Sequence, residues 1–371
     1  MIIKSVVISP KTVTVASPVT VTATFDRVFP WLTLRNNHRN WAEIKAAYQN
    51  WFFGISEIIW SGGASMAIQQ IRAKVNGTWT VLTLDEATGN YVGTIAAPAI
   101  TSYNVNAGHY YPVTIEATNK AGTVTTFDES NSVVGDDLKL FVKEVTKPTI
   151  AITAPTAGAF LASGVPEIAF QLRDEASGSG INLSSLIMTV DGTEHRVGEM
   201  TATPATNGYN VTYKPKTALS DGEHTITINV SDNDGNTAVA VSRTFTTDTV
   251  QPTLSITAPS SNDTWVAVAS FTIAGATNDS VSGIDSVSIS VNGKDAGTVT
   301  IGSNGTFSKA ITLSEGANTV VITATDKAGK ITTITRTINL DTGGVEITNV
   351  VIAPNPVNVN GSYTITVTAK G

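Results

Sequence analysis

The sequence predicts an all-β protein made of tandem immunoglobulin-like (Ig-like) β-sandwiches, with a short tryptophan-rich helical insertion in its N-terminal module. Val-Thr-Lys-Pro-Thr-Ile-Ala-Ile-Thr-Ala-Pro at 145–155 returns as Val-Gln-Pro-Thr-Leu-Ser-Ile-Thr-Ala-Pro at 250–259. The two copies lie about 100 residues apart, the size of an immunoglobulin-type sandwich. Each opens a stretch of short runs rich in Thr, Val and Ile, which strands favour. Tandem sandwiches usually form rods, spacers and attachment arms, so the repeat argues against an enzyme.

Two kinds of turn recur in register with this repeat. Val-Asx-Gly occurs at 75–77, 190–192 and 291–293, and Asn-Gly or Asp-Gly supplies the positive φ angles of a type I′ hairpin turn. A second Gly-bearing turn, at 119–122, 232–236 and 326–329, lies between alternating runs and is typical of the last hairpin of an Ig-like sandwich. Three copies of each turn indicate three sandwiches.

The repeats divide the chain into four parts. We predict an N-terminal module at 1–145, Ig-like domains at 146–248 and 249–342, and a partial β module at 343–371 that resembles residues 2–25. Linkers of one or two residues with a proline, at Pro148 and Pro252, would limit bending, so a semi-rigid rod is expected.

The C-terminal part is too short to bury a core alone. We predict that it is ordered by packing on the third sandwich or by pairing with a neighbouring chain. The alternative is a flexible tail.

Composition limits what the chain can do. It has 371 residues, enough for two to four domains, with 41 % apolar residues, 14 % charged residues and a net charge of −7. No basic patch could neutralise several phosphates, which argues against nucleic-acid binding. The absence of cysteine excludes disulfides and thiolate metal sites. No apolar run approaches the ~18 residues of a membrane span, and the opening residues lack the features of a secretory signal. Synthesis in the cytoplasm without a signal peptide is therefore expected.

The N-terminal module contains an aromatic segment with helical spacing. Apolar residues from position 41 to 58 step by three and four, with Asn40 as a candidate N-cap and Glu43 three residues inside, so a helix is predicted over about 39–60. This stripe either packs on its own domain or forms an assembly interface, where Trp and Tyr are favoured anchors. A sugar-stacking platform fits less well, because the rings share one core-like stripe. The candidate interface residues are Trp31, Trp41, Ile44, Tyr48, Trp51 and Trp60.

Three motifs stand out beside the repeats: the opening Ile-x-x-Val-x-Ile-x-Pro followed by Val-x-Val, its second copy at 352–361, and Trp41-Ala-Glu-Ile-Lys45. Together they resemble tail or baseplate-associated proteins of phages and phage-tail-like particles from Gram-positive bacteria. The resemblance covers the opening strands, the Trp segment and the C-terminal fragment, whose copy lacks a Trp segment. It implies a virion structural protein that anchors by its N-terminal module and projects its Ig-like domains as a spacer or host-attachment arm.

The implied partners are other tail or baseplate proteins, copies of the chain itself and host cell-wall polysaccharide. The Ig-like remainder also resembles bacterial surface adhesin repeats. The alternative function is therefore a cell-surface adhesin or polysaccharide-binding rod.

No catalytic constellation is recognisable. The four histidines lie in separate segments without metal-ligand spacing, and no nucleophile elbow, phosphate loop or dinucleotide fingerprint occurs. Acidic pairs such as Asp136-Asp137 and Asp174-Glu175 are interpreted as solvated turn residues.

Calcium is the one ligand that the composition admits. Asp232, Asp234 and Asn236 group oxygen donors of the type that Ca²⁺ accepts, although such a turn is most often only a hairpin turn. The loops that begin at Asp174 and Asp279 are parallel cases with the same interpretation. No other cofactor is expected.

Overall fold

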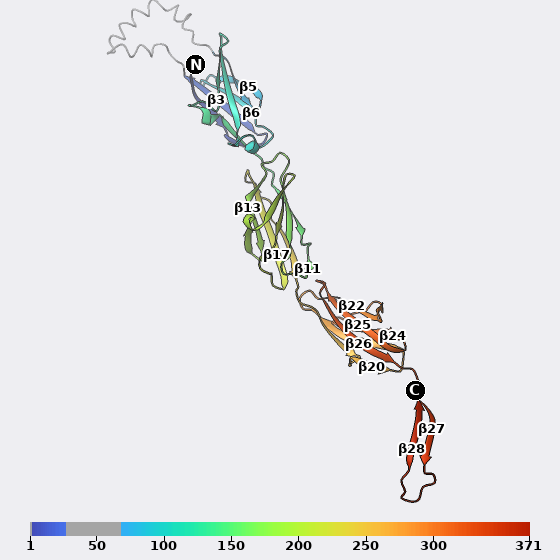
Figure 1. The fold of residues 1–371 in the computed structure, drawn as a ribbon. Helices are drawn as coiled ribbons and strands as arrows, with labels where there is room; N and C mark the ends of the chain where they lie inside the picture. The colour runs from blue at the N-terminus through green and yellow to red at the C-terminus, as the bar shows by residue number, and fades with distance from the viewer. Residues whose placement is uncertain (1, 27–67) are drawn as a thin grey trace, which may run out of the picture.

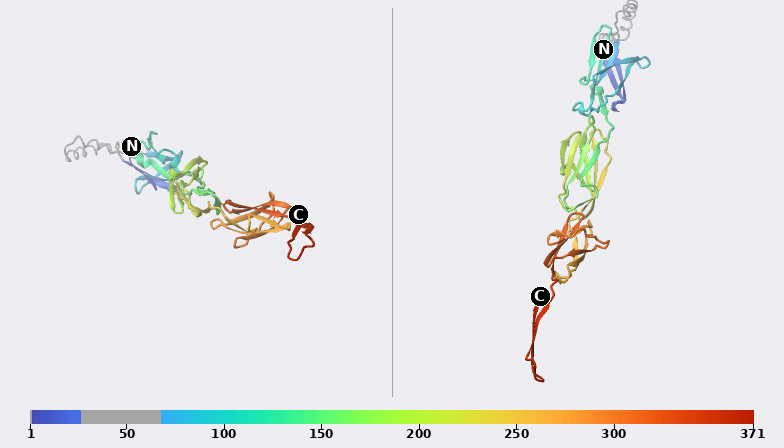
Figure 2. Two further views of the ribbon diagram at one scale, coloured as in Figure 1. Left: turned by 60° about the horizontal axis from the view of Figure 1, so that its bottom comes forward. Right: turned by 90° about the vertical axis from the view of Figure 1, so that its right-hand side faces the viewer.

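The computed structural model describes residues 2–26 and 68–371, and it confirms an all-β protein of tandem Ig-like domains. Three β-sandwiches follow one another end to end, and a two-stranded hairpin extends beyond the third (Figure 1). Two further views show the same elongated arrangement (Figure 2). The predicted helix over about 39–60 and its candidate interface lie outside the described residues; that interface consists of Trp31, Trp41, Ile44, Tyr48, Trp51 and Trp60.

The first sandwich is a single continuous sheet folded over its own core. Its order is β1-β3-β6-β5-β4-β7-β9-β2, with β8 paired to β7, because β5 pairs with β4 at one end and with β6 at the other. Two 3₁₀ turns, η2 (Ser102–Asn104) and η3 (Gly135–Leu138), lie in its loops. The strands are β1 (Ile2–Ser9), β2 (Thr12–Thr14), β3 (Pro18–Asp26), β4 (Ile68–Val75), β5 (Thr78–Asp85), β6 (Asn90–Ala96), β7 (Tyr111–Asn119), β8 (Val124–Phe127) and β9 (Lys139–Lys143).

The second sandwich has two separate sheets. Their orders are β10-β12-β16-β15 and β11-β18-β17-β13-β14, and a 3₁₀ turn, η4 (Val197–Glu199), follows β14. The strands are β10 (Thr149–Ala154), β11 (Ala159–Leu161), β12 (Ile168–Arg173), β13 (Ile181–Val190), β14 (Thr193–Arg196), β15 (Thr201–Ala205), β16 (Gly208–Tyr213), β17 (Gly222–Asp232) and β18 (Val241–Thr247).

The third sandwich repeats this plan with one strand fewer. Its sheets have the orders β19-β21-β24 and β20-β26-β25-β22-β23. The strands are β19 (Thr253–Ala258), β20 (Asp263–Val266), β21 (Ser270–Asn278), β22 (Ile284–Val291), β23 (Lys294–Asp295), β24 (Thr306–Thr312), β25 (Gly316–Asp326) and β26 (Ile331–Leu340).

In every sandwich the first strand divides between the two layers. Its first half pairs antiparallel in one layer, and its second half pairs in parallel with the last strand of the other layer, as in β2–β9, β11–β18 and β20–β26. The break comes at Pro10, Pro155 and Pro259, each after a cis peptide. Proline has no N–H to donate to a ladder, so the pairing of the first half ends there.

The Val-Asx-Gly turns form as predicted, because both central residues of each turn have positive φ. The Asx side chain also ties the turn to the neighbouring strand. Asp191 accepts hydrogen bonds from the buried His224 ring and from Thr225 N. Asn292 donates through Nδ2 to Oδ1 of the buried Asn318 and accepts through Oδ1 from Thr319 N. These bonds tie the second and third turns to β17 and β25, the strands that pair with β13 and β22.

Each sandwich buries its own apolar core, which the period-2 alternation of its strands supplies. In the second sandwich, β12 buries every other residue, and the largest enclosed side chains include Phe170 and Phe245. Within 2–26 and 68–371 the three cores are separate clusters, so no apolar core is shared between sandwiches there.

The C-terminal hairpin, β27 (Glu346–Ala353) and β28 (Thr364–Lys370), repeats the β1–β3 pair in the same register. Ile8 faces Val21 in the first pair, and Ile352 faces Ile365 in the second. The register irregularity near the start of the strand also recurs at the same place. The chain therefore carries the opening strands of one module twice.

The hairpin does not pack on the third sandwich, which was one of the two arrangements predicted for it. All residues of β27 and β28 are exposed, including the counterparts of positions that the first sandwich buries. Figure 1 shows the hairpin projecting beyond the third sandwich. Pairing with a neighbouring chain stays a prediction.

The two copies provide a matched pair for mutation. Ile8 is 6 % exposed and Ile352 is 44 % exposed at the equivalent position. Ile8→Ala should destabilise the first sandwich by about 2–5 kcal/mol through lost burial and a cavity. Ile352→Ala should stay within about 0.5 kcal/mol. Scanning calorimetry of both full-length variants measures this, and a comparable loss of stability from Ile352→Ala would contradict the exposed hairpin.

Candidate metal centres at the domain junctions

Three linkers of equal length, at 144–148, 248–252 and 341–345, leave the three sandwiches. These linkers are longer than the one or two residues that the sequence predicted. Hydrogen bonds with side chains fix their positions. In the second, Thr249 donates through its N–H and its hydroxyl to the two carboxylate oxygens of Asp221, at 2.8 and 3.0 Å. In the third, Thr342 makes the same pair of bonds to Glu315, at 3.1 and 3.0 Å. Each linker begins with an acidic residue.

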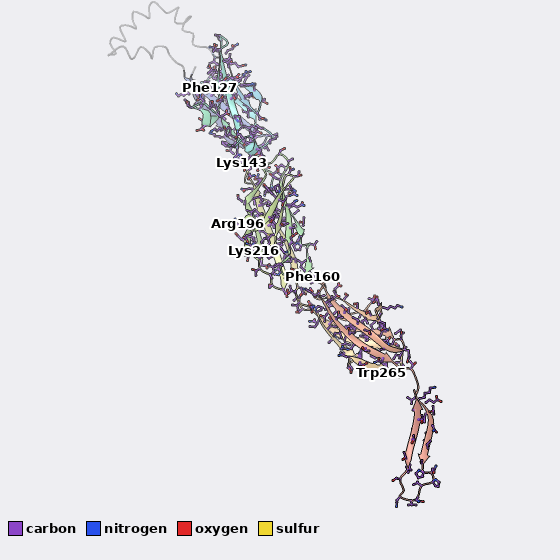
Figure 3. All side chains as sticks on the ribbon, in the orientation of Figure 1. Phe127, Lys143, Phe160, Arg196, Lys216 and Trp265 are labelled. Carbon is purple, nitrogen blue, oxygen red and sulfur yellow. The ribbon has the colours of Figure 1, made fainter. Side chains whose placement is uncertain are left out.

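Direct hydrogen bonds join the first two sandwiches. Asp234 Oδ2 accepts from Thr101 Oγ1 at 2.5 Å and from Glu144 N at 3.0 Å, while Asn236 Nδ2 donates to Glu144 O at 3.2 Å. Lys143 Nζ donates to Asp234 O at 3.1 Å, and Figure 3 shows this lysine where the two domains meet. The last hairpin of the second sandwich is therefore hydrogen-bonded to the end of the first sandwich.

Beside these bonds, three carboxyl groups converge. Glu144 comes from the linker, and Asp174 and Glu175 come from the loop between β12 and β13. One oxygen from each lies within 4.8 Å of the others. Glu144 is 5 % exposed and Asp174 is 8 % exposed. The interpretation of Asp174-Glu175 as a solvated pair was therefore wrong, whereas Asp136 and Asp137 do lie at the surface.

Each of these carboxyl groups retains an oxygen without a partner. Glu144 Oε1 accepts from Ser179 N and Asp174 Oδ2 accepts from Gly180 N, but Glu144 Oε2, Asp174 Oδ1 and Glu175 Oε2 are enclosed and accept no hydrogen bond. Carboxylate oxygens are acceptors only, so neighbouring ones can interact favourably only through a shared proton or a shared cation.

The pKa values of these carboxyl groups are shifted for the same reason, the burial of neighbouring acidic groups. Burial raises the pKa of Glu144 to about 8, and the neighbouring Glu175 carboxyl group adds to the shift. Burial also raises the pKa of Asp174 to about 6. Without a cation, the cluster therefore keeps a proton at neutral pH, because desolvation disfavours the charged form.

A second cluster lies between the second and third sandwiches. Asp248 begins the linker, Asp279 follows β21, and Asp326 ends β25; one oxygen from each lies within 4.8 Å of the others. Asp248 is completely buried, and Asp326 is 1 % exposed with its Oδ2 unpartnered. Burial alone would raise the pKa of Asp279. Hydrogen bonds from three backbone N–H groups outweigh this effect, so the pKa of Asp279 is lowered.

The backbone bonds of the two junctions correspond. Glu144 accepts from Ser179 N, and Asp248 Oδ2 accepts from Ser282 N at 3.1 Å. Across the second junction, Lys327 Nζ lies 5.4 Å from the ring centroid of Phe160, which Figure 3 labels at the meeting of the two domains. Lys327 therefore reaches from the third sandwich toward the second.

The predicted calcium ligands Asp232, Asp234 and Asn236 are at the first junction, but their oxygens serve other contacts. Asp232 accepts from Gly235 N and Asn236 N through Oδ1, and from Asn236 Nδ2 through Oδ2. These bonds shape the hairpin turn, the interpretation that the sequence favoured. Calcium binding by this trio stays a prediction.

Sequence reasoning missed Glu144, Asp248 and the grouping of Asp279 with Asp326. The available signal was the acidic residue at the end of each repeat, at 144, 248 and 341, in step with the acidic loops at 174 and 279. Each residue looks ordinary by itself, because the members of a cluster come from distant parts of the chain, as Asp248 and Asp326 do.

Two of the sandwiches match known family models, and one of these models is a bacterial Ig domain. Residues 148–228 match the family model described as bacterial Ig domain. Residues 252–342 match the model described as glucodextranase, domain B. A search of curated proteins gives no match.

Several solved structures are similar to the whole chain at low identity. A tetra-tandem repeat from the extending region of a large adhesion protein is 16 % identical, with 98 % of this chain and 87 % of that chain covered and a TM-score of 0.34. A structure of a 1.5-MDa bacterial ice-binding adhesin is 17 % identical, with 92 % and 99 % covered and a TM-score of 0.29. The ICAM-5 D1–D4 ectodomain fragment is 9 % identical, with 94 % and 79 % covered and a TM-score of 0.45.

The strand order and the two family matches define the class of protein. The chain is a tandem array of Ig-like domains, an architecture typical of non-enzymatic structural or adhesion proteins. No helix within 2–26 or 68–371 is long and apolar enough to span a membrane. The matches do not bear on the predicted phage-tail role.

The raised pKa of Glu144 predicts a pH dependence in the presence of a chelator. The folded state retains a proton that the unfolded state has lost, so stability falls as pH rises between the ordinary value of 4.5 and about 8. Glu144→Gln lacks this titration, so the variant should gain stability relative to wild type between pH 5 and pH 8. Thermal unfolding in EDTA measures this.

The matched control is Glu223→Gln, which changes an exposed glutamate on β17. It should follow the wild-type curve at every pH. Parallel curves for wild type and Glu144→Gln would show that the buried carboxyl group carries no such proton.

Proposed function

We propose that this protein is a non-enzymatic rod that holds a binding or anchoring end away from a surface, in the manner of a bacterial cell-surface adhesin. The observation that carries the proposal is the end-to-end joining of the sandwiches through buried linker carboxylates and side-chain hydrogen bonds. An attachment arm that holds one end away from a surface needs this kind of fixed spacing between its domains. The match of residues 148–228 to the bacterial Ig domain supports the proposal.

A polysaccharide of the bacterial cell wall is the partner class we propose for this rod. Labelled full-length chain should be retained saturably on purified Gram-positive cell walls. Retention should fall to background on walls stripped of their polysaccharide, which serve as the control. Equal retention on intact and stripped walls would overturn the proposed partner.

A second function is favoured by the duplicated module. The pairing of β1 with β3 recurs in β27 and β28, and both copies carry the strand motif that resembles phage tail and baseplate-associated proteins. In this alternative the chain is a virion component made in the host cytoplasm. Its N-terminal module anchors it to other tail proteins, and its C-terminal hairpin pairs with a further copy.

Immunogold labelling of purified particles separates the two functions. Labelled particles support the virion component, and deletion of residues 1–63 should then abolish incorporation. Retention on cell walls without particle labelling supports the surface rod. A chain that neither binds walls nor labels particles would contradict both.

The rod itself predicts a measurable shape. Strand β17 has 11 residues, which corresponds to about 36 Å and gives about 110 Å for three sandwiches in line. A rod of that length has a radius of gyration of roughly 30 Å, against about 21 Å for a compact chain of this size. Small-angle X-ray scattering should give the larger value. The smaller value would show that the domains fold back on one another.

A further inference from the structure

We propose that each acidic cluster at a domain junction binds one calcium ion, so that the chain holds two. The first site comprises Glu144, Asp174 and Glu175, and the second comprises Asp248, Asp279 and Asp326. The inference is independent of what the rod attaches to, because the ligands all belong to this chain.

Uncompensated charge is the first argument. Three carboxylates converge in each cluster, and none of the six takes part in an ion pair among the described residues. Burying an isolated carboxylate is costly unless a counter-charge or a metal accompanies it. One divalent cation removes most of this cost at each junction.

The unpartnered oxygens are the second, independent argument. Glu144 Oε2, Asp174 Oδ1 and Asp326 Oδ2 belong to side chains that are more than nine-tenths buried, and each lacks a hydrogen-bond donor. The other oxygen of each of these groups is held by a backbone N–H. The carboxyl groups are thus fixed with one oxygen left to bind a ligand.

Donor chemistry and spacing favour calcium. All the ligands are oxygens, with no imidazole or thiolate, which suits a hard cation. Ca²⁺ binds oxygen at 2.3–2.6 Å, so two oxygens on opposite sides of one ion lie about 5 Å apart. The oxygens of each cluster, which lie within 4.8 Å of one another, can therefore share one calcium ion. Mg²⁺ demands near-ideal octahedral geometry and usually keeps several waters, so it suits three clustered side-chain carboxyl groups less well.

The ligands of each site come from two successive domains, so a bound ion has a mechanical role. Glu144 and Asp248 lie directly after the last strands of the first and second sandwiches, while the other ligands belong to the next sandwich. A bound ion therefore ties the end of one domain to the loops of the following one. Calcium should stiffen both junctions, and its removal should leave the cores intact while the junctions loosen.

Isothermal titration calorimetry tests the sites with calcium chloride as the probe and the full chain stripped by chelator. Wild type should bind two Ca²⁺ with dissociation constants on the order of 10⁻⁴ M, as in extracellular modules. Glu144→Gln and Asp326→Asn should each bind one ion, and the double variant should bind none. Glu223→Gln, the exposed control, should bind two.

Thermal unfolding in EDTA verifies that each variant folds, and Glu175→Gln and Asp279→Asn replace any variant that does not. Absence of saturable binding by wild type at millimolar calcium would overturn the proposal. Unchanged stoichiometry in a junction variant would overturn that site. Magnesium binding as tight as calcium would overturn the assignment of the ion.

Small-angle scattering with calcium and with EDTA tests the mechanical role separately. Wild type should become more extended in calcium, while the double variant should scatter identically in both buffers. Two bound ions without a change in wild-type scattering would overturn the stiffening.

Discussion

The structure depends on one repeated constraint, the burial of an acidic linker residue where one sandwich meets the next. Glu144 and Asp248 leave their own domain and enter the loops of the following one, where backbone N–H groups receive them. A carboxyl group in that position cannot be solvated by water, so it must be neutralised locally. The neighbouring carboxyl groups increase the cost of burying this charge unless a cation is present. The path of each linker and the chemistry of each junction therefore follow from the same placement.

The fold was predictable because its signals are local. Alternation along each strand and the Asx-Gly pairs with positive φ at 76–77, 191–192 and 292–293 both act within a few residues. The three sandwiches and their hairpins follow from these signals. The division of the first strand between two layers was not predicted, since it depends on pairing with the last strand of the same domain, far along the chain.

The junction clusters could not be derived in the same way, because burial changes the meaning of an acidic residue. At the sequence level, Asp174 and Asp279 are ordinary turn residues, and Glu144 is an ordinary linker residue. Their chemistry arises only when a second domain covers them and removes water. The calcium prediction began from Asp232 and its neighbours, which are at the first junction but shape the turn. Oxygen-rich spacing located the region, whereas the buried carboxyl groups that packing brings together there are those of Glu144, Asp174 and Glu175.

The third linker has a consequence for how such a chain can change in length. Asp341 N donates to Val266 O as Asp248 N donates to Leu161 O, and Thr342 repeats the contacts of Thr249. The outgoing end of the third sandwich is thus shaped like that of the second. A duplicated copy of one whole domain supplies loops that match such an end. The copy can therefore be inserted there without altering any core. The length of the rod can therefore evolve one domain at a time. Unequal recombination between repeats suffices, and existing contacts need not change.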